Sequence, residues 1–303
     1  MARVFTILAT LVLLNSCIGL DAANQIQGYS LSGEPLVSAP PSVDALQKLA
    51  AAKAVFAANP KDADAIIWFG RRTAYTGDYL SSIDIFSDAI ALYPSDPRLY
   101  RHRGHRYISI REFAKAAADL ETAASLIQGK ANAIEPDGLP NAQNIPLTTT
   151  HGNIWYHLGL TYYLLQDWPN ALRAFEQGYG IGGNDDNLVS TGHWIYMIHR
   201  RMGNADAAAA ALGEINGDMT IIENMSYHQL CLLYTNEISI DQMMAANGDD
   251  PSNAAVAYGI ANYYYYNGDR EKSDALLNSI LQGSSWASFG YIAAEADLAN
   301  PKR

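Results

Sequence analysis

The sequence predicts an all-α solenoid of about six antiparallel helix pairs, with a capping helix at each end. Three observations predict this fold class. A complete helix-pair signature occurs at 155–175, and its small and aromatic positions recur in five other segments. The chain is also long and apolar enough to bury a substantial core, since 49% of its 303 residues are apolar and only 17% are charged.

The signature segment is WYHLGLTYYLLQDWPNALRAF, with the spacing W-x2-L-G-x2-Y followed by A-x3-F. The small residues Gly159 and Ala171 allow two antiparallel helices to approach closely, while the larger residues fill the space between them. This spacing resembles the tetratricopeptide repeat. The resemblance implies a right-handed superhelical solenoid in which the first helix of each pair lines a concave groove.

Five further segments fit the same frame. They are residues 63–94, residues 97–128 and the stretches that begin near 189, 224 and 254. Flanking helices at 43–58 and roughly 286–298 would cover the apolar faces that terminal repeats otherwise leave in water. The predicted solenoid domain therefore covers residues 43–303.

The N-terminus has the pattern of an export signal. Residues 1–16 place one arginine before a short apolar run, which suits a signal peptide and is too short to span a membrane. LNSC at 14–17 resembles the lipobox of bacterial lipoproteins, which implies lipidation of Cys17, with ordinary signal cleavage nearby as the alternative. Residues 17–42 mix Gly, Ser and Pro and predict a flexible tether.

Residue 18 bears on the location of the protein. It is isoleucine rather than aspartate, which in Gram-negative lipoproteins implies an outer-membrane lipoprotein facing the periplasm. A soluble periplasmic or secreted protein is the alternative. Cys231 is then the only other cysteine, so no intramolecular disulfide is expected.

Residues 128–148 form a long insertion between the second and third repeats. Loops of this length are commonly functional or disordered. The stretches PDG and LPN predict tight turns, so we expect a structured loop along one edge of the groove. A tolerated surface insertion is the alternative.

A wider resemblance covers most of the mature chain. The stretches that support it include YRHRGHRYIS at 100–109, GNIWYHLGL at 152–160 and WASFGYIAAEADL at 286–298. They resemble a family of bacterial tetratricopeptide proteins, often exported, without assigned biochemistry. The resemblance implies the architecture and leaves the activity open.

The groove positions of the repeats carry basic and aromatic residues, although the formal net charge is -11. Asp64 is the one acid at these positions. The predicted partner-binding residues are Arg71, Tyr75, Arg98, Arg101, His105, Tyr156, His193, Arg200, Arg201, His228, Tyr258 and Tyr265. Because arginine binds carboxylates through two donors and tyrosine adds rigid contact area, we expect a non-enzymatic scaffold that binds an acidic peptide or protein.

The alternative for the arginines is pairing with acids on neighbouring helices or on the 128–148 loop. Arg103 differs from the others because it stands where the repeat normally has leucine. A buried pair with Asp119 or Glu121 is therefore expected for Arg103 rather than contact with a ligand.

Two other functions are weighed. A metal-binding or catalytic protein would need His105, His193 and His228 to converge, but no metal-ligand motif accompanies them, so no cofactor is expected. Exposed tyrosines could instead stack on sugars, which would make the protein a glycan-binding lipoprotein. The acidic composition argues against nucleic acid and anionic lipid as partners.

Two motifs receive structural interpretations. The glycines at 178, 180 and 183 match G-x-G-x-x-G, but they follow a helix instead of a strand and predict a helix terminator. The acid pairs at 185–186 and 249–250 lie in turns and are interpreted as helix caps.

Overall fold

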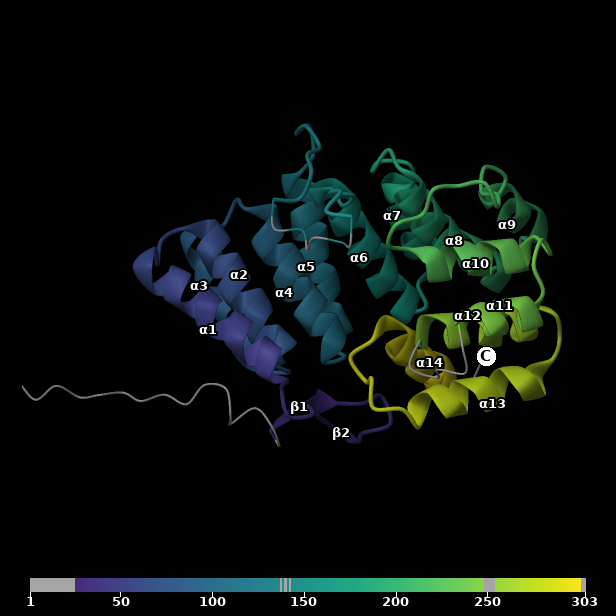
Figure 1. Ribbon diagram of the computed structural model, residues 1–303, viewed down its shortest axis with the longest axis horizontal. Coiled ribbons are helices and arrows are strands. Elements are labelled where there is room, and N and C mark those ends of the chain that lie inside the picture. Colours follow the sequence, from purple (N-terminus) through teal and green to yellow (C-terminus); the bar gives the residue numbers. More distant parts are fainter. Residues whose placement is uncertain (1–24, 137, 139–140, 142, 248–253, 301–303) are drawn as a thin grey trace, which may run out of the picture.

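The computed structural model describes residues 25–136, 138, 141, 143–247 and 254–300, and within them the chain is an all-α solenoid (Figure 1). The first three helix pairs are α2 (Ala63–Tyr75) with α3 (Tyr79–Leu92), α4 (Pro97–Ser109) with α5 (Phe113–Leu126), and α6 (Thr150–Leu164) with α7 (Trp168–Gly178). The next three are α8 (Asp185–Arg201) with α9 (Ala205–Ala211), α10 (Met225–Tyr234) with α11 (Ile240–Asn247), and α12 (Ala254–Tyr266) with α13 (Arg270–Leu281). The predicted number of pairs is confirmed for these residues.

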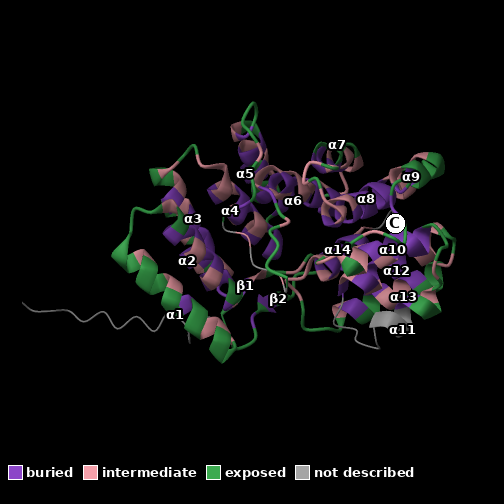
Figure 2. Ribbon diagram, turned by 45° about the horizontal axis from the view of Figure 1, so that its top comes forward, coloured by how far each residue is buried: buried purple, intermediate pink, exposed green. Residues whose placement is uncertain are grey.

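The two predicted capping helices are present. The first, α1 (Val43–Ala58), packs on α2 and leaves most of its other side exposed (Figure 2). The second, α14 (Phe289–Ala299), packs against α12 and α13 and also contacts α6. None of the helices in the described ranges is both long enough and apolar enough to span a membrane.

Aspartates and glycines explain why the pairs form where they do. Asp62, Asp96 and Asp167 each accept a backbone hydrogen bond at the start of a helix, as N-capping residues do. Gly159 packs so closely on its partner helix that a Cβ there would lie 2.6 Å from the ring of Phe175. The small positions of the repeat are therefore close contacts between paired helices, as the sequence predicts.

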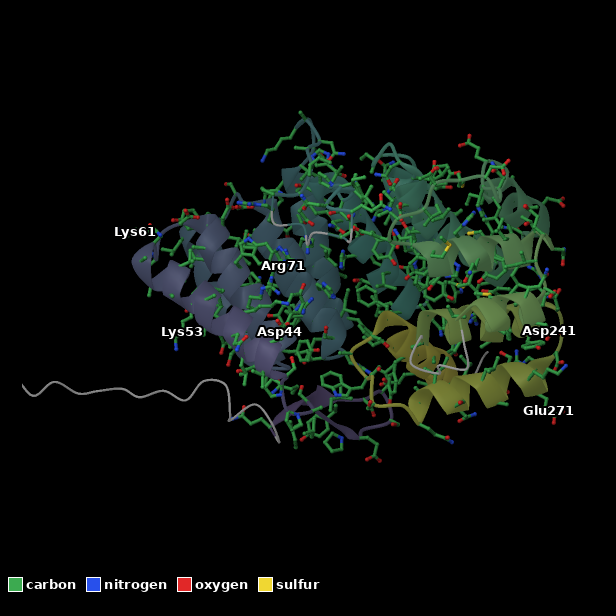
Figure 3. The ribbon with its side chains drawn as sticks, in the orientation of Figure 1. Asp44, Lys53, Lys61, Arg71, Asp241 and Glu271 are labelled. Atoms are coloured by element: carbon green, nitrogen blue, oxygen red, sulfur yellow. The ribbon has the colours of Figure 1, made fainter. Side chains whose placement is uncertain are left out.

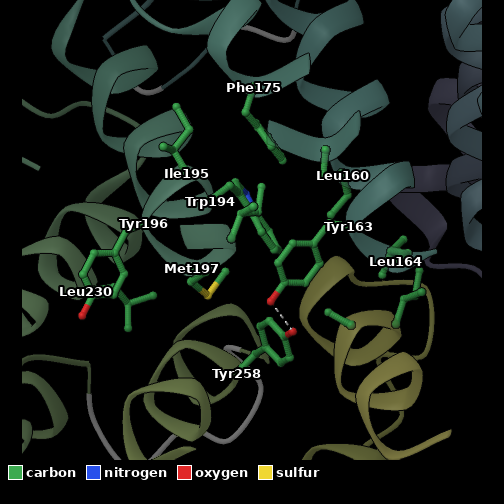
Figure 4. Close-up of a cluster of buried hydrophobic side chains, with 14 of the residues drawn as sticks. Leu160, Tyr163, Leu164, Phe175, Trp194, Ile195, Tyr196, Met197, Leu230 and Tyr258 are labelled. Carbon is green, nitrogen blue, oxygen red and sulfur yellow. Dashed lines mark hydrogen bonds between the residues drawn. The ribbon is translucent and has the colours of Figure 1, made fainter. Parts of the chain in front are cut away.

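The main core is aromatic and runs from α4 to α14. At its centre Trp194 lies 4.8 Å from Tyr163, ring centre to ring centre, and the Tyr163 hydroxyl is 2.8 Å from that of Tyr258 (Figure 4). A second, smaller core joins α2, α3 and α4. Its largest buried side chain is Phe86, which is fully inaccessible to solvent.

Residues 26–37 correct the tether prediction. They form an antiparallel hairpin of β1 (Ile26–Tyr29) and β2 (Pro35–Val37). Gln27 is 1% exposed, and its Oε1 accepts the backbone N–H groups of Tyr79 and Leu80 at the start of α3. The expected flexible segment is therefore wrong at 26–37, because the glutamine amide supplies the cap and fixes the hairpin.

The C-terminal segment closes the solenoid against its N-terminal half. Glu295 on α14 forms a buried ion pair with Arg111, 2.6 Å from Nη2, and accepts the backbone N–H of Leu31. The Trp286 indole donates to the carbonyl of Val37 at 2.9 Å. Phe289 lies against the rings of two histidines on α4 and α6. The hairpin, α4 and α14 thus meet at one junction.

Candidate binding site

The first two predicted groove arginines are paired with acids of the chain itself. Arg98 contacts Asp96 at 2.7 Å and Asp64 at 2.6 Å. Arg101 is 5% exposed and forms an ion pair with Glu135 of the inserted loop. The alternative weighed from sequence therefore holds for these arginines, and the prediction that they face a partner as free charges is wrong.

The pairing expected for Arg103 is confirmed. Its guanidinium donates two hydrogen bonds to the carboxylate of Asp119, both at 2.7 Å, and a third to Ser87 at 3.0 Å. This two-donor geometry connects α4 to α5, the two helices of the second pair. Arg103 thus stabilises the repeat.

The inserted loop is ordered where the structure describes it. Glu135 is 6% exposed and accepts from the side chain of Asn153 at 2.5 Å, in addition to pairing with Arg101. An isolated bridge joins Ile134 to Thr149. The loop therefore inserts its carboxylate between α4 and α6, which explains why Arg101 faces the protein interior.

The cations of α8 also have internal partners. Arg201 forms an ion pair with Asp297 and donates to Asn262 at 2.6 Å, which joins α8 to α12 and α14. Arg200 donates to the Tyr196 hydroxyl at 2.8 Å and to the carbonyl of Tyr266 at 2.9 Å. The assignment of Arg201 to partner binding is corrected, because its side chain is buried in the domain.

The three histidines proposed to converge do not meet. His193 is 1% exposed and lies between Tyr227 and Tyr234, and burial lowers its pKa to about 3. His228 is also buried, and its Nε2 lies 2.8 Å from the carbonyl of Asn216. Neither can contact a partner as predicted. Within the described ranges, no cluster of three or more metal-ligating side chains is present.

His105 instead stacks with a neighbour from α6. Its ring lies 4.6 Å from that of His157 and 5.1 Å from that of Phe289. Burial lowers the pKa of His105 well below its ordinary value, and Arg106 adds to the effect. Burial likewise lowers the pKa of His157, to about 3. Both rings are therefore neutral near pH 7.

The predicted tyrosines differ in position. Tyr258 is 1% exposed and donates to Asp297 at 2.9 Å, so it belongs to the core and its assignment to a partner surface is wrong. Tyr265 lies between two guanidinium groups, with ring centres 4.7 Å from Arg201 and 4.6 Å from Arg270. Its ring thus contacts one buried and one exposed cation.

Arg71 and Tyr75 lie together on α2. The guanidinium of Arg71 donates to the Tyr75 hydroxyl at 3.2 Å and lies 4.7 Å from the ring of Trp68. Arg71 lies inside the N-terminal half, whereas Lys53 and Lys61 lie at its outer rim (Figure 3). Tyr75 is 41% exposed, so its ring remains open to solvent.

The sequence did not identify a polar pocket that lies between α6, α8 and two loops. Its volume is about 280 Å³. Tyr156 and Tyr227 line it, their hydroxyls 3.0 Å apart, and the Trp194 indole donates to the Tyr156 hydroxyl at 3.0 Å. Other lining residues are Thr148, Thr149, Asn153, Asn184, Asn187, Ser190, Glu223, Asn224 and Phe289.

Asp186 builds one wall of this polar pocket. Its carboxylate accepts the backbone N–H groups of Ile222, Glu223 and Asn224 at 2.7 to 2.9 Å. Asp185 accepts the N–H of Thr220 in the same way. The interpretation of 185–186 as simple helix caps is corrected, since these acids fix the loop before α10. The acids at 249–250 lie outside the described residues.

One sequence signal does point to this polar pocket. The run NDDN at 184–187 concentrates short polar side chains at the start of α8, more than one N-cap requires. The glycines before it behave as predicted, because α7 ends at Gly178, and Gly180 and Gly183 have positive φ angles of 69° and 64°. The loop partners of Asp186 could not be predicted, because they lie 36 to 38 residues away.

Comparison with known proteins yields structural similarity alone. No family model matches the chain, and no curated protein matches it in sequence. It is similar to the crystal structure of YrrB, a TPR protein with an unusual peptide-binding site, with a TM-score of 0.41 and 17% identity over 77% of this chain and 91% of that one.

Two larger assemblies contain similar chains. Naa15/Naa10 bound to HypK-THB gives a TM-score of 0.37 with 15% identity, and the APC/C hetero-tetramer Cut9-Hcn1 gives 0.36 with 14%. The matches cover 78% and 84% of this chain. They span 34% and 46% of those chains, less than half of each.

Proposed function

We propose that this chain is a non-enzymatic interaction protein that holds a short segment of a protein partner in the polar pocket beside Tyr156 and Tyr227. The observation that carries the proposal is the composition of the pocket wall. Amide and hydroxyl side chains converge there on an aromatic floor, which is how proteins bind an extended peptide through both its backbone and a side chain.

The charge of the pocket sets the kind of segment it would take. Its lining contains the carboxylates of Asp186 and Glu223 and no lysine or arginine. The arginines expected to bind an acidic peptide are largely paired elsewhere. A neutral or weakly basic segment that offers hydrogen-bond donors therefore fits this pocket better than an acidic one.

The titratable groups around the pocket favour binding over acid–base chemistry. Burial raises the pKa of Tyr156 well above its ordinary value, and the nearby Tyr227 adds to the effect. Burial also raises the pKa of Tyr227 and lowers that of His193 to about 3. All three side chains are neutral and hold their protons near pH 7, whereas a general acid or base needs a pKa near the working pH.

A photo-crosslinking residue at Thr148 tests the proposal. Thr148 is exposed and lines the polar pocket, so a benzophenone side chain there can reach a bound segment. Gln128, exposed at the end of α5, is the matched control position. We expect a discrete protease-sensitive adduct in intact cells from position 148 and none from position 128. Equal labelling from both positions would contradict the proposal.

A glycan is the second candidate ligand for the same pocket. Tyrosine rings beside asparagine and aspartate side chains are also able to stack on and hydrogen-bond a sugar. The crosslinking experiment separates the two, because a glycan adduct would resist protease and be cleaved by periodate.

We further propose that the protein is an outer-membrane lipoprotein of a bacterial envelope, anchored by Cys17 and facing the periplasm. The support is the lipobox-like LNSC stretch and the isoleucine at position 18, both in the sequence. Cys17 itself lies outside the described residues. Metabolic labelling with an alkynyl fatty acid should tag the wild type and fail with Cys17→Ala, whereas labelling of both would contradict the anchor.

A further inference from the structure

Arg106 differs from the other buried arginines of α4. It is 7% exposed. Arg101 and Arg103 on the same helix reach carboxylates, but no oxygen in the described part of the chain accepts a hydrogen bond from the guanidinium of Arg106. A buried guanidinium without an acceptor is costly, so its retention requires an explanation.

The surroundings of Arg106 are basic and aromatic. Its guanidinium carbon lies 5.8 Å from the ring centre of Tyr79. Burial lowers the pKa of Arg106, and the groups that act on its charge are Tyr75, Tyr79 and the like-charged Arg71. No carboxylate is among these groups. The positive potential at this point is therefore left for something outside the described chain to neutralise.

A pocket of about 460 Å³ adjoins these residues, between the turn that joins α2 to α3 and the segment before α14. Tyr75, Tyr79 and Ser288 line it. The hydroxyl of Ser288 is buried and makes no hydrogen bond with the described residues. The Tyr75 hydroxyl accepts from Arg71 and so keeps its own proton to donate.

We propose that Arg106, Tyr75 and Ser288 form a binding site for an oxyanion group, the carboxylate or phosphate of a small ligand. The two hydroxyls and the guanidinium supply donors, and an oxyanion is the acceptor that all three lack. This oxyanion site is distinct from the polar pocket and goes beyond the function proposed above. The 284–288 segment supplies Ser288, so the oxyanion site is complete only when the solenoid is closed.

Calorimetric titration of the full chain with inorganic phosphate and, separately, with acetate at constant ionic strength tests the site and tells the two ligand classes apart. We expect saturable binding of at least one anion. Arg106→Gln should weaken it by about 10- to 100-fold, since hydrogen bonds to a charged group are lost. Tyr75→Phe and Ser288→Ala should each weaken it less. Arg173→Gln, which removes an exposed charge paired with Glu121, should leave it unchanged.

A melting experiment separates loss of the site from loss of the fold. Without anion, Arg106→Gln should melt no lower than the wild type, because Arg106 has no acceptor to lose, whereas Arg103→Gln should melt lower because it leaves Asp119 without its partner. If Arg106→Gln fails to fold, titration of Tyr75→Phe and Ser288→Ala decides the matter. Wild-type protein that binds neither anion, or variants that bind as well as it does, would overturn the proposal.

Discussion

The two halves of the solenoid are stabilised by different interactions. Around α4, arginines occupy the interior, and acids hold two of them, from α5 and from the inserted loop. From α6 to α14 the interior is aromatic, with Trp194, Tyr163 and Tyr258 at its centre. The same repeat therefore tolerates either charge or aromatic rings inside. The charged half provides the proposed oxyanion site, and the aromatic half supplies the rigid floor of the polar pocket.

The largest expected effect is in the aromatic half. Trp194→Ala should lower the free energy of unfolding by about 4 kcal/mol, because a large buried ring is replaced by a cavity. Urea unfolding followed by circular dichroism measures this. Leu92→Ala, at an exposed apolar position on α3, is the control and should change little. A loss below about 1 kcal/mol for Trp194→Ala would show that the aromatic cluster is not the main stabilising core.

The junction between the halves should give the next largest effect. Glu295→Gln leaves Arg111 buried without its carboxylate and should cost about 3 kcal/mol. The double variant Arg111→Met, Glu295→Leu removes both charges and should recover most of that loss, since a buried pair gives little net stability over apolar packing. Equal losses in the single and double variants would show that closure does not depend on this ion pair.

The pH dependence should separate the buried histidines from the carboxylates. Burial lowers the pKa of His193 to about 3, below the value of about 6.5 expected in the unfolded chain. On acidification the unfolded chain therefore takes up the proton first. The stability that this neutral histidine contributes is complete above about pH 6.5 and is lost as pH falls toward 3, by about 1.4 kcal/mol per pH unit.

His193→Phe tests this directly. Phenylalanine keeps the contacts with Tyr227 and Tyr234 and cannot bind a proton. The slope of unfolding free energy against pH between 6 and 4 should therefore be shallower than in the wild type by about one proton's contribution. Identical slopes would mean that His193 can be protonated within the fold.

The smallest expected effect is at the edge of the charged half. Arg98→Ala removes a partly exposed guanidinium from two acids, one of which, Asp64, is largely exposed. The loss should stay below about 1 kcal/mol and shrink further at high salt. A loss above about 2 kcal/mol would place Arg98 among the buried structural arginines.

The repeat could be predicted from sequence because it depends on local spacing. Gly159 and Ala171 mark the contact between paired helices, and the structure places both there. The hairpin at 26–37 could not be predicted, because a single buried glutamine fixes it to α3, more than 50 residues away. Composition alone cannot distinguish such a segment from a tether.

The side-chain partners set the limit for the candidate site. Arg101, a predicted groove residue, is neutralised by Glu135, and the path of the inserted loop that brings the acid there depends on tertiary contacts. Arg103 and Asp119 were predictable because adjacent helices of one pair carry them. The charge on a groove position is thus readable from sequence, but its neutralisation by a distant loop is not.

The most direct test of the proposed function is the affinity of the crosslinked partner for three versions of the chain. The versions are the wild type, Thr148→Trp, which fills the polar pocket, and Arg98→Gln, which alters only the predicted arginine groove. We predict that Thr148→Trp weakens binding by about tenfold or more and that Arg98→Gln changes it by less than about twofold. The reverse result would contradict the account and return binding to the arginines of α4.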